Sequence, residues 1–250
     1  MRKRRRRSVY LLPNLLTSMS LFGGFYAMVA TLDKRFFQAG IAILLSCVLD
    51  ALDGTVARMT NSTSRFGVEY DSLSDAIAFG VAPGLLAYMW ALKGYGRFGW
   101  LAAFLYVACG TLRLARFNVQ VDTIQKKQFL GLPIPAAAAT IAAAVLFFGE
   151  FGIPGEVKKV FVPILIYGLA FLMVSTVRYS SFKESSALGT RHFEAVVGAI
   201  LLFVIVLIEP AITLFVITMG YVISGPVSYM FRHMFRRKAA FEETPHSKGA

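Results

Sequence analysis

Four aspartates within the stretch 50–75 carry the clearest chemical pattern of the chain. Asp50 and Asp53 are three positions apart, and Asp71 and Asp75 are four positions apart. Residues three or four apart share one face of a helix, so two antiparallel helices could present all four carboxylates to one cavity. Oxygen ligands favour hard cations, and four carboxylates would neutralise two divalent ions such as Mg²⁺ or Mn²⁺. The pattern predicts a two-metal site of the kind that clamps a displacement at phosphorus.

Small and basic residues accompany these acids. Gly54, Ala57 and Gly67 leave backbone uncovered, which would let a diphosphate or a flat base approach closely. Arg58 and Arg65 supply fixed positive charge for phosphate oxygens. Helix packing alone would also explain small residues, and acids can cap helices or line an ion path, but the spacing of the whole set favours the metal site.

Long apolar runs must position this stretch. The chain is 56% hydrophobic and only 16% charged, with a mean hydropathy of +0.62, whereas soluble domains carry about 25% charged residues. A span needs roughly 20 apolar residues, so the chain has room for about eight passes and no large soluble domain. We therefore expect an all-α, polytopic integral membrane protein. Its spans are expected at 13–32, 36–57, 71–92, 98–117, 130–149, 159–178, 194–209 and 211–231.

The membrane domain is thus expected to cover residues 13–231, between a basic N-terminal segment, 1–12, and a basic and polar tail, 232–250. Both aspartate pairs fall at the same membrane face, because one pair ends the second span and the other begins the third.

Charge placement indicates the orientation. The net charge is +12, and the 26 Lys and Arg residues cluster between the apolar runs, mostly on the side of the N-terminus. This bias predicts that both termini and the aspartates face the cytoplasm of a prokaryotic inner (plasma) membrane. The same clustering argues against nucleic-acid binding. Cys47 and Cys109 lie inside apolar runs and indicate neither a disulfide nor a zinc site.

The aspartates and their small and basic neighbours form one continuous motif. It reads Asp50-x2-Asp53-Gly54-x2-Ala57-Arg58-x8-Gly67-x3-Asp71-x3-Asp75 and resembles the complete signature of the CDP-alcohol phosphotransferase family. The resemblance implies a membrane enzyme that moves a phosphatidyl or similar group from a CDP-linked donor to an alcohol, releasing CMP.

The resemblance also implies roles for the motif. The four aspartates would share two divalent cations, Mg²⁺ or Mn²⁺, on the donor diphosphate, with Asp75 as the general base. Gly54, Ala57, Arg58 and Gly67 would hold the cytidine and diphosphate. Asn14 and Thr17, at the start of the first span, lie where similar proteins place polar residues near the nucleotide. An N-cap role is the alternative for Asn14. A homodimer is implied by the resemblance alone.

Later segments resemble the membrane-type phosphatidylserine synthases of this family, whose substrates would be CDP-diacylglycerol and L-serine. They are Thr111-Leu-Arg113-Leu-Ala-Arg116-Phe-Asn118, Phe129-Leu-Gly131-Leu-Pro133-Ile-Pro135, and Val174-Ser175 with Tyr179, Ser181, Phe182 and Lys183. Physically, an amino-acid acceptor brings a carboxylate that an arginine fork grips well, which favours Arg113 and Arg116, with Asn118 beside them. Lys183 is a candidate contact for a donor phosphate, and a solvated lysine is its alternative.

Other functions fit less of the sequence. Phosphate-bearing acceptors also attract arginine, so a phosphatidylglycerophosphate or phosphatidylinositol-phosphate synthase is the alternative. Catalysis through a phosphatidyl-histidine is not supported, since only His246 and Lys248 begin the required motif. We expect instead direct attack by the acceptor hydroxyl, with a carboxylate taking its proton. A cation transporter is a remote alternative, because the acids lie at one membrane face and no internal repeat is seen.

Overall fold

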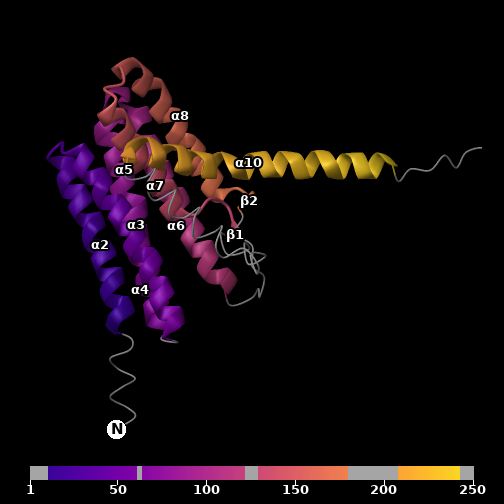
Figure 1. The fold of residues 1–250 in the computed structure, drawn as a ribbon, viewed down its shortest axis with the longest axis horizontal. Coiled ribbons are helices and arrows are strands. Elements are labelled where there is room, and N and C mark those ends of the chain that lie inside the picture. Colours follow the sequence, from indigo (N-terminus) through magenta and orange to yellow (C-terminus); the bar gives the residue numbers. More distant parts are fainter. Residues whose placement is uncertain (1–10, 61–63, 122–128, 180–207, 243–250) are drawn as a thin grey trace, which may run out of the picture.

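A computed structural model describes residues 11–60, 64–121, 129–179 and 208–242 of the chain (Figure 1). The elements in chain order are α2 (Leu11–Leu32), α3 (Phe36–Met59), α4 (Arg65–Asp75), the π-helix η1 (Ala76–Val81), α5 (Ala82–Ala87), the π-helix η2 (Tyr88–Leu92), the 3₁₀-helix η3 (Lys93–Tyr95), α6 (Arg97–Val121), β1 (Phe129–Leu130), α7 (Ile134–Glu150), α8 (Gly155–Val174), β2 (Arg178–Tyr179) and α10 (Pro210–Glu242). The described fold is therefore helical, apart from one short pair of strands.

Six of the described helices are long and apolar enough to cross a membrane, by length and composition. They are Leu12–Leu32, Phe36–Met59, Arg65–Tyr95, Arg97–Val119, Gly155–Val174 and Pro210–Phe231. The shorter apolar helix Ile134–Glu150 corresponds to the fifth expected span. The expectation of an all-α, polytopic membrane protein is confirmed. The expected span 194–209 lies almost entirely outside the described residues.

The third span begins earlier than expected. It starts at Arg65 rather than at residue 71, because the Ser64 hydroxyl accepts a 3.0 Å hydrogen bond from the Gly67 backbone N–H and caps the helix. The first turns of α4 are polar, so apolar content alone did not reveal them. As a consequence, Asp71 lies within a helix that continues on both sides.

The same span changes its helical type immediately after Asp75. The π-helix η1 begins at Ala76, and the buried Tyr106 of α6 donates a 3.0 Å hydrogen bond to the Phe79 carbonyl oxygen within it. Gly24 of α2 lies so close to Ala78 that a side chain at Gly24 would collide with it. A π turn is rare and locally changes which residues face a neighbour. Tyr106 and Gly24 thus contact the turn that follows the aspartates from two sides.

The helices α2 and α3 form an antiparallel pair. Ser20 Oγ donates to the Ser46 carbonyl oxygen at 3.1 Å, and Ser46 Oγ lies 3.0 Å from the Ser20 carbonyl oxygen. Gly23 leaves room for the Ser46 side chain, which a Cβ at this position would strike. Small and hydroxyl-bearing residues at such contacts let apolar helices pack closely without a buried unpaired group.

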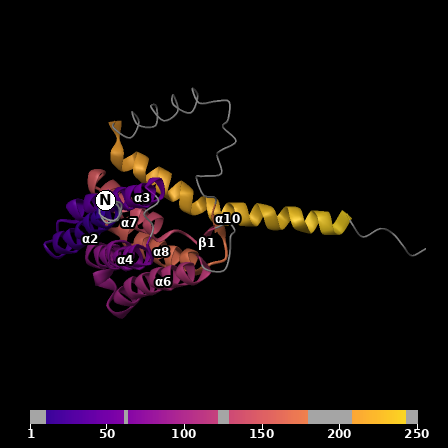
Figure 2. The ribbon, with the colours of Figure 1, turned by 90° about the horizontal axis from the view of Figure 1, so that it is seen from below.

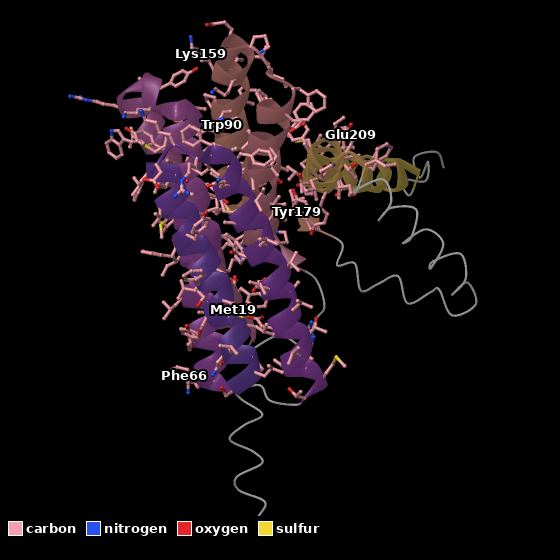
Figure 3. The ribbon with its side chains drawn as sticks, turned by 60° about the vertical axis from the view of Figure 1, so that its left-hand side comes forward. Met19, Phe66, Trp90, Lys159, Tyr179 and Glu209 are labelled. Carbon is pink, nitrogen blue, oxygen red and sulfur yellow. The ribbon has the colours of Figure 1, made fainter. Side chains whose placement is uncertain are left out.

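The helix α10 differs from the others in direction. It packs against α7 and β2, runs across the direction of α2 and α3, and its C-terminal part extends away from the other helices (Figures 1 and 2). It continues to Glu242, beyond residue 231 where the last span was expected to end, so part of the expected tail 232–250 is helical. The two ends of the bundle are marked by Phe66 and Lys159, and Tyr179 lies beside α10 (Figure 3).

Candidate active site at one end of the bundle

The acidic cluster is built by α3 and α4. Asp50, Asp53 and Asp71 each offer one carboxylate oxygen, and these three atoms lie within 4.8 Å of one another. Asp53 is buried, and the other two are partly buried. Asp75 joins the group through a side-chain hydrogen bond with Asp50. The structure thus brings all four predicted aspartates together.

The cluster fits a divalent cation. Asp71 Oδ1 is buried and has no hydrogen-bond partner among the described residues. The ion pairs found in the described part of the chain are Arg35–Asp33 and Lys159–Glu156, so none of them neutralises these four carboxylates. Converging carboxylate oxygens with a buried, unpaired acceptor are a donor set for a hard cation such as Mg²⁺ or Mn²⁺.

Helix α2 supplies polar contacts to the cluster. Thr17 Oγ1 donates a 2.7 Å hydrogen bond to Asp53 Oδ2 and also lies 3.1 Å from the Pro13 carbonyl oxygen. The hydroxyls of Ser18 and Tyr70 are 2.8 Å apart and tie α2 to α4. The residues Ser18 and Tyr70 were missed from the sequence, where no spacing links them. Thr17 therefore acts on the site by orienting Asp53.

The predicted nucleotide-binding residues lie at the same end. A Cβ at Gly54 would lie 3.3 Å from Arg58 Nη1, so the glycine makes room for the exposed guanidinium. A Cβ at Gly67 would lie 3.4 Å from Asn14 Oδ1. Ala57 is partly buried on α3 beside them.

Asn14 lies inside α2, whose first residue is Leu11, so the alternative reading of Asn14 as a helix N-cap is wrong. Its Oδ1 faces Gly67 of α4 instead.

The predicted acceptor-binding residues on α6 differ in how they contact α4 and its aspartates. Asn118 Nδ2 donates to Ser72 Oγ at 3.0 Å, and Ser72 Oγ lies 3.2 Å from Asn118 Oδ1, so α6 is bound to α4 between two aspartates. The Arg113 guanidinium interacts electrostatically with Asp75, and its Nε is buried without a hydrogen-bond partner among the described residues. Arg116 is exposed, and Lys183 lies outside the described residues.

The two short strands β1 and β2 form an antiparallel pair. Phe129 pairs with Tyr179, and Leu130 pairs with Arg178. Gly131 follows with φ 81, a backbone conformation that favours glycine, and its N–H donates to the Val177 carbonyl oxygen at 2.9 Å. A Cβ at Gly131 would collide with the Met173 carbonyl oxygen.

Tyr179 links this turn to α10. It is buried, and its hydroxyl donates a 3.0 Å hydrogen bond to the Val222 carbonyl oxygen. Burial, with a smaller contribution from the neighbouring Tyr221, raises the pKa of Tyr179 to about 12, so the hydroxyl keeps its proton near neutral pH. Its ring centroid is 5.4 Å from that of Tyr221. Tyr221 was also missed from the sequence, because it lies far from every motif.

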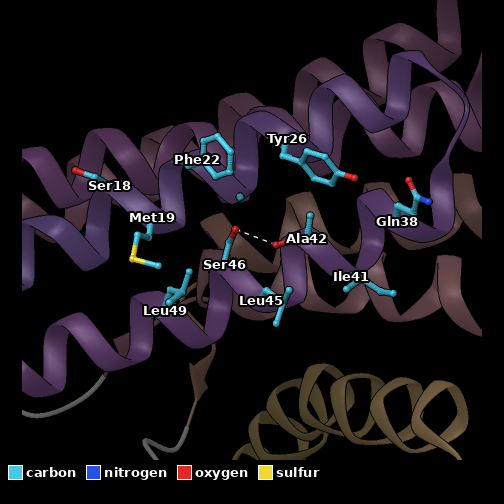
Figure 4. A pocket seen from close by; sticks show the side chains of 11 residues that line it. Ser18, Met19, Phe22, Tyr26, Gln38, Ile41, Ala42, Leu45, Ser46 and Leu49 are labelled. Atoms are coloured by element: carbon cyan, nitrogen blue, oxygen red, sulfur yellow. Dashed lines mark hydrogen bonds between the residues drawn. The ribbon is translucent and has the colours of Figure 1, made fainter.

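An apolar groove of about 620 Å³ runs between α2 and α3 (Figure 4). Its lining includes Met19, Phe22 and Leu45. Ser18 and Leu49 belong to its wall and adjoin Thr17 and Asp50, while Gln38 lines it near the turn between the two helices. The groove thus runs along the helix pair, and its lining includes the residues next in sequence to Thr17 and Asp50.

Comparison with known proteins places this site in a family context. The family model for CDP-alcohol phosphatidyltransferase matches residues 10–177. A CDP-diacylglycerol–serine O-phosphatidyltransferase of Helicobacter pylori is 38% identical over 224 residues, covering 89% of this chain and 92% of the relative. The protein of that name from Mycobacterium leprae is 32% identical over an alignment that covers 90% of this chain and 76% of the relative. An archaetidylserine synthase of Methanothermobacter thermautotrophicus is 39% identical over 69% of this chain and 70% of its own.

Proposed function

Because this chain belongs to the CDP-alcohol phosphatidyltransferase family, we propose that it is a CDP-diacylglycerol–serine O-phosphatidyltransferase of a prokaryotic membrane. It transfers the phosphatidyl group of CDP-diacylglycerol to the hydroxyl of L-serine and releases CMP. The single observation that carries this proposal is the electrostatic interaction of Asp75 in the acidic cluster with Arg113, a partly buried cation whose buried Nε has no hydrogen-bond partner among the described residues. That arrangement suits an acceptor that brings both a hydroxyl and a carboxylate.

The acidic cluster would hold the divalent cations at the donor site. Asp50, Asp53, Asp71 and Asp75 would be their ligands, and Thr17 keeps the Asp53 carboxylate in its orientation. When bound, the cations stabilise the negative charge that develops on the phosphate being attacked and on the departing CMP. Arg58, Gly54, Ala57, Gly67 and Asn14 lie at the same end and would contact the diphosphate and the cytidine.

The acceptor reacts by direct attack. The L-serine carboxylate binds Arg113, which places the L-serine hydroxyl near Asp75. Asp75 accepts the hydroxyl proton as the serine oxygen forms its bond to the phosphorus, and the bond from phosphorus to CMP breaks. Arg116 and Lys183 remain proposed contacts for anionic groups, and Asn118 fixes α6 to α4 so that Arg113 and Asp75 keep their relative positions.

One acyl chain of the donor lies in the groove between α2 and α3. The groove wall is apolar, it faces outward, and Ser18 at one end is adjacent to the residue that orients Asp53. From Ser18 to Tyr26 the groove follows α2 for about 12 Å at the rise of an α-helix. An extended hydrocarbon chain fits such a path while the headgroup stays at the aspartates.

The orientation with both termini in the cytoplasm is likewise a proposal, as is a homodimer. The cluster of basic residues before the first span supports the orientation.

The proposal is tested by measuring CMP release from CDP-diacylglycerol by the purified protein with Mg²⁺ or Mn²⁺. Parallel reactions contain L-serine, glycerol 3-phosphate or inositol phosphate. We expect release with L-serine, abolished in Asp75→Asn and retained in Asp33→Asn, which alters an exposed aspartate in the turn between α2 and α3. Release with another acceptor would replace L-serine in the proposal, and no release with any acceptor would overturn it.

A further inference from the structure

Helix α10 brings a residue from outside the family-matched region to the acceptor side of the site. The family model ends at residue 177, whereas Tyr221 lies in α10. Tyr221 and Arg113 interact electrostatically with each other, and Arg113 also interacts with Asp75. Arg113 is therefore coupled electrostatically both to the proposed general base and to a tyrosine of α10.

The position of Tyr221 is set by close contacts with the turn that carries Tyr179. The Tyr179 hydroxyl donates to the carbonyl oxygen of Val222, the residue next to Tyr221, at 3.0 Å. One turn further along α10, Gly225 faces the Tyr179 ring so closely that a Cβ there would collide with it. The two tyrosine rings lie with their centroids 5.4 Å apart and their planes at 41°. These contacts fix the position of α10 along its own axis relative to β2.

We propose that Tyr221 is a specificity-determining residue for the acceptor, its hydroxyl binding the acceptor carboxylate together with Arg113, and that the contact of Tyr179 with Gly225 positions it. This inference rests on the proposed function. A carboxylate accepts several hydrogen bonds on two oxygens, so it can engage the Arg113 guanidinium and a neighbouring hydroxyl at once.

The location of Tyr221 also fits a role in acceptor choice. The matched region 10–177 contains the aspartates and the residues proposed to hold the CDP moiety, whereas Tyr221 lies outside it. Acceptor choice needs groups that are paired by one acceptor and left unpaired by another. An acceptor without a carboxylate, such as serinol, cannot make these contacts with Arg113 and Tyr221.

The first test replaces Tyr221 with phenylalanine, which keeps the ring against Tyr179 and removes only the hydroxyl. A lost hydrogen bond to a charged group predicts a rise of about tenfold or more in the KM for L-serine. The KM for CDP-diacylglycerol stays unchanged, and the preference for L-serine over serinol, compared as kcat/KM, falls by the same factor. Tyr229→Phe, two turns further along α10 at a half-exposed position, serves as the control and leaves both values unchanged.

The second test moves Tyr221 without altering it. Gly225→Ala introduces a methyl group against the Tyr179 ring, whereas a Cβ at Gly220 would meet no described heavy atom within 4 Å. Both substitutions raise helix propensity equally, so Gly220→Ala is a matched control. We expect Gly225→Ala, but not Gly220→Ala, to raise the KM for L-serine while the KM for CDP-diacylglycerol is retained.

The outcomes separate the inference from the function on which it rests. A wild-type protein that releases no CMP with L-serine overturns the proposed function. The role of Tyr221 alone is overturned by a different result. In that result the wild-type protein releases CMP with L-serine, and the Tyr221→Phe variant is folded with an unchanged KM for L-serine and an unchanged preference for L-serine over serinol. An equal rise of both substrate KM values, or a loss of kcat alone, assigns Tyr221 to packing and also overturns it.

Discussion

The Thr17 hydroxyl donates a 2.7 Å hydrogen bond to Oδ2 of Asp53 and so joins helix α2 to the acidic cluster on α3 and α4. Asp53 is the most buried aspartate of the cluster, at 5% exposure, so the orientation of its carboxylate depends on this partner. A second hydroxyl pair, Ser18 with Tyr70, connects the same helix to α4.

Replacing Thr17 with valine removes this bond and keeps the branched shape. Hydrogen bonds to charged groups contribute about 1.5–3 kcal/mol, so we expect the Mn²⁺ concentration for half-maximal CMP release to rise about tenfold or more. Calorimetric titration with Mn²⁺ should show the same loss of affinity without any substrate. Thr31→Val is the matched control, because Thr31 is also buried but its hydroxyl donates within its own helix, to the Ala27 carbonyl oxygen. Equal metal affinity in both variants would contradict the role of Thr17.

Replacing Tyr106 with phenylalanine removes the hydroxyl that binds the Phe79 carbonyl oxygen inside η1. Because the buried carbonyl loses this hydrogen bond, we expect a loss of about 1–3 kcal/mol in unfolding free energy and a lower kcat. Thermal unfolding in detergent and initial rates measure the two effects. Tyr167→Phe removes a hydroxyl that lies 3.5 Å from the Phe98 carbonyl oxygen at an exposed position, and it should change neither.

Filling the groove between α2 and α3 should weaken binding of a long-chain donor. Leu45 lines the groove, whereas Val48 on the same helix is not among the described residues that line it, and both side chains are more than half exposed. We expect Leu45→Trp to raise the KM for long-chain CDP-diacylglycerol and to leave the KM for a short-chain analogue unchanged. Val48→Trp should alter neither. A long-chain KM that stays at the wild-type value in Leu45→Trp places the acyl chain elsewhere.

Gly131→Ala tests the turn that supports Tyr179. Gly131 has φ 81 and no room for a Cβ beside the Met173 carbonyl oxygen, whereas Gly152 has φ 54 and a Cβ there would meet no described heavy atom within 4 Å. Left-handed backbone penalises both alanines by roughly 1 kcal/mol, so the further loss of stability in Gly131→Ala measures the collision alone. Unfolding midpoints of the two variants should differ clearly, and equal midpoints would show that the turn adapts.

The grouping of the four aspartates could be predicted from the sequence, because the two members of each pair are only three or four positions apart. Three- and four-residue intervals place each pair on one helix face, and a short connection makes the two helices neighbours. The apolar runs likewise predicted the helical membrane fold, and the signature predicted the family, which the family model confirms. These inferences need only one or two helices at a time.

Contacts between distant helices could not be predicted in the same way. Thr17 with Asp53, Ser18 with Tyr70 and Arg113 with Tyr221 each depend on how whole helices are rotated and stacked. Helix boundaries also depend on local hydrogen bonds, as Ser64 shows at the start of α4, although a serine three residues before Gly67 is a readable capping signal. The apolar pattern of α10 does not indicate the direction in which this helix runs relative to the others.

The paired hydrogen bonds between Asn118 and Ser72 have a thermodynamic consequence. Ser72 lies between Asp71 and Asp75 in the sequence, and Asn118 lies on the helix that carries Arg113, so the proposed cation side and the proposed acceptor side are connected through these bonds. Any displacement of α6 by a bound acceptor would therefore act on the aspartates. Linkage then makes the effect reciprocal: the factor by which L-serine changes cation affinity equals the factor by which the cation changes L-serine affinity.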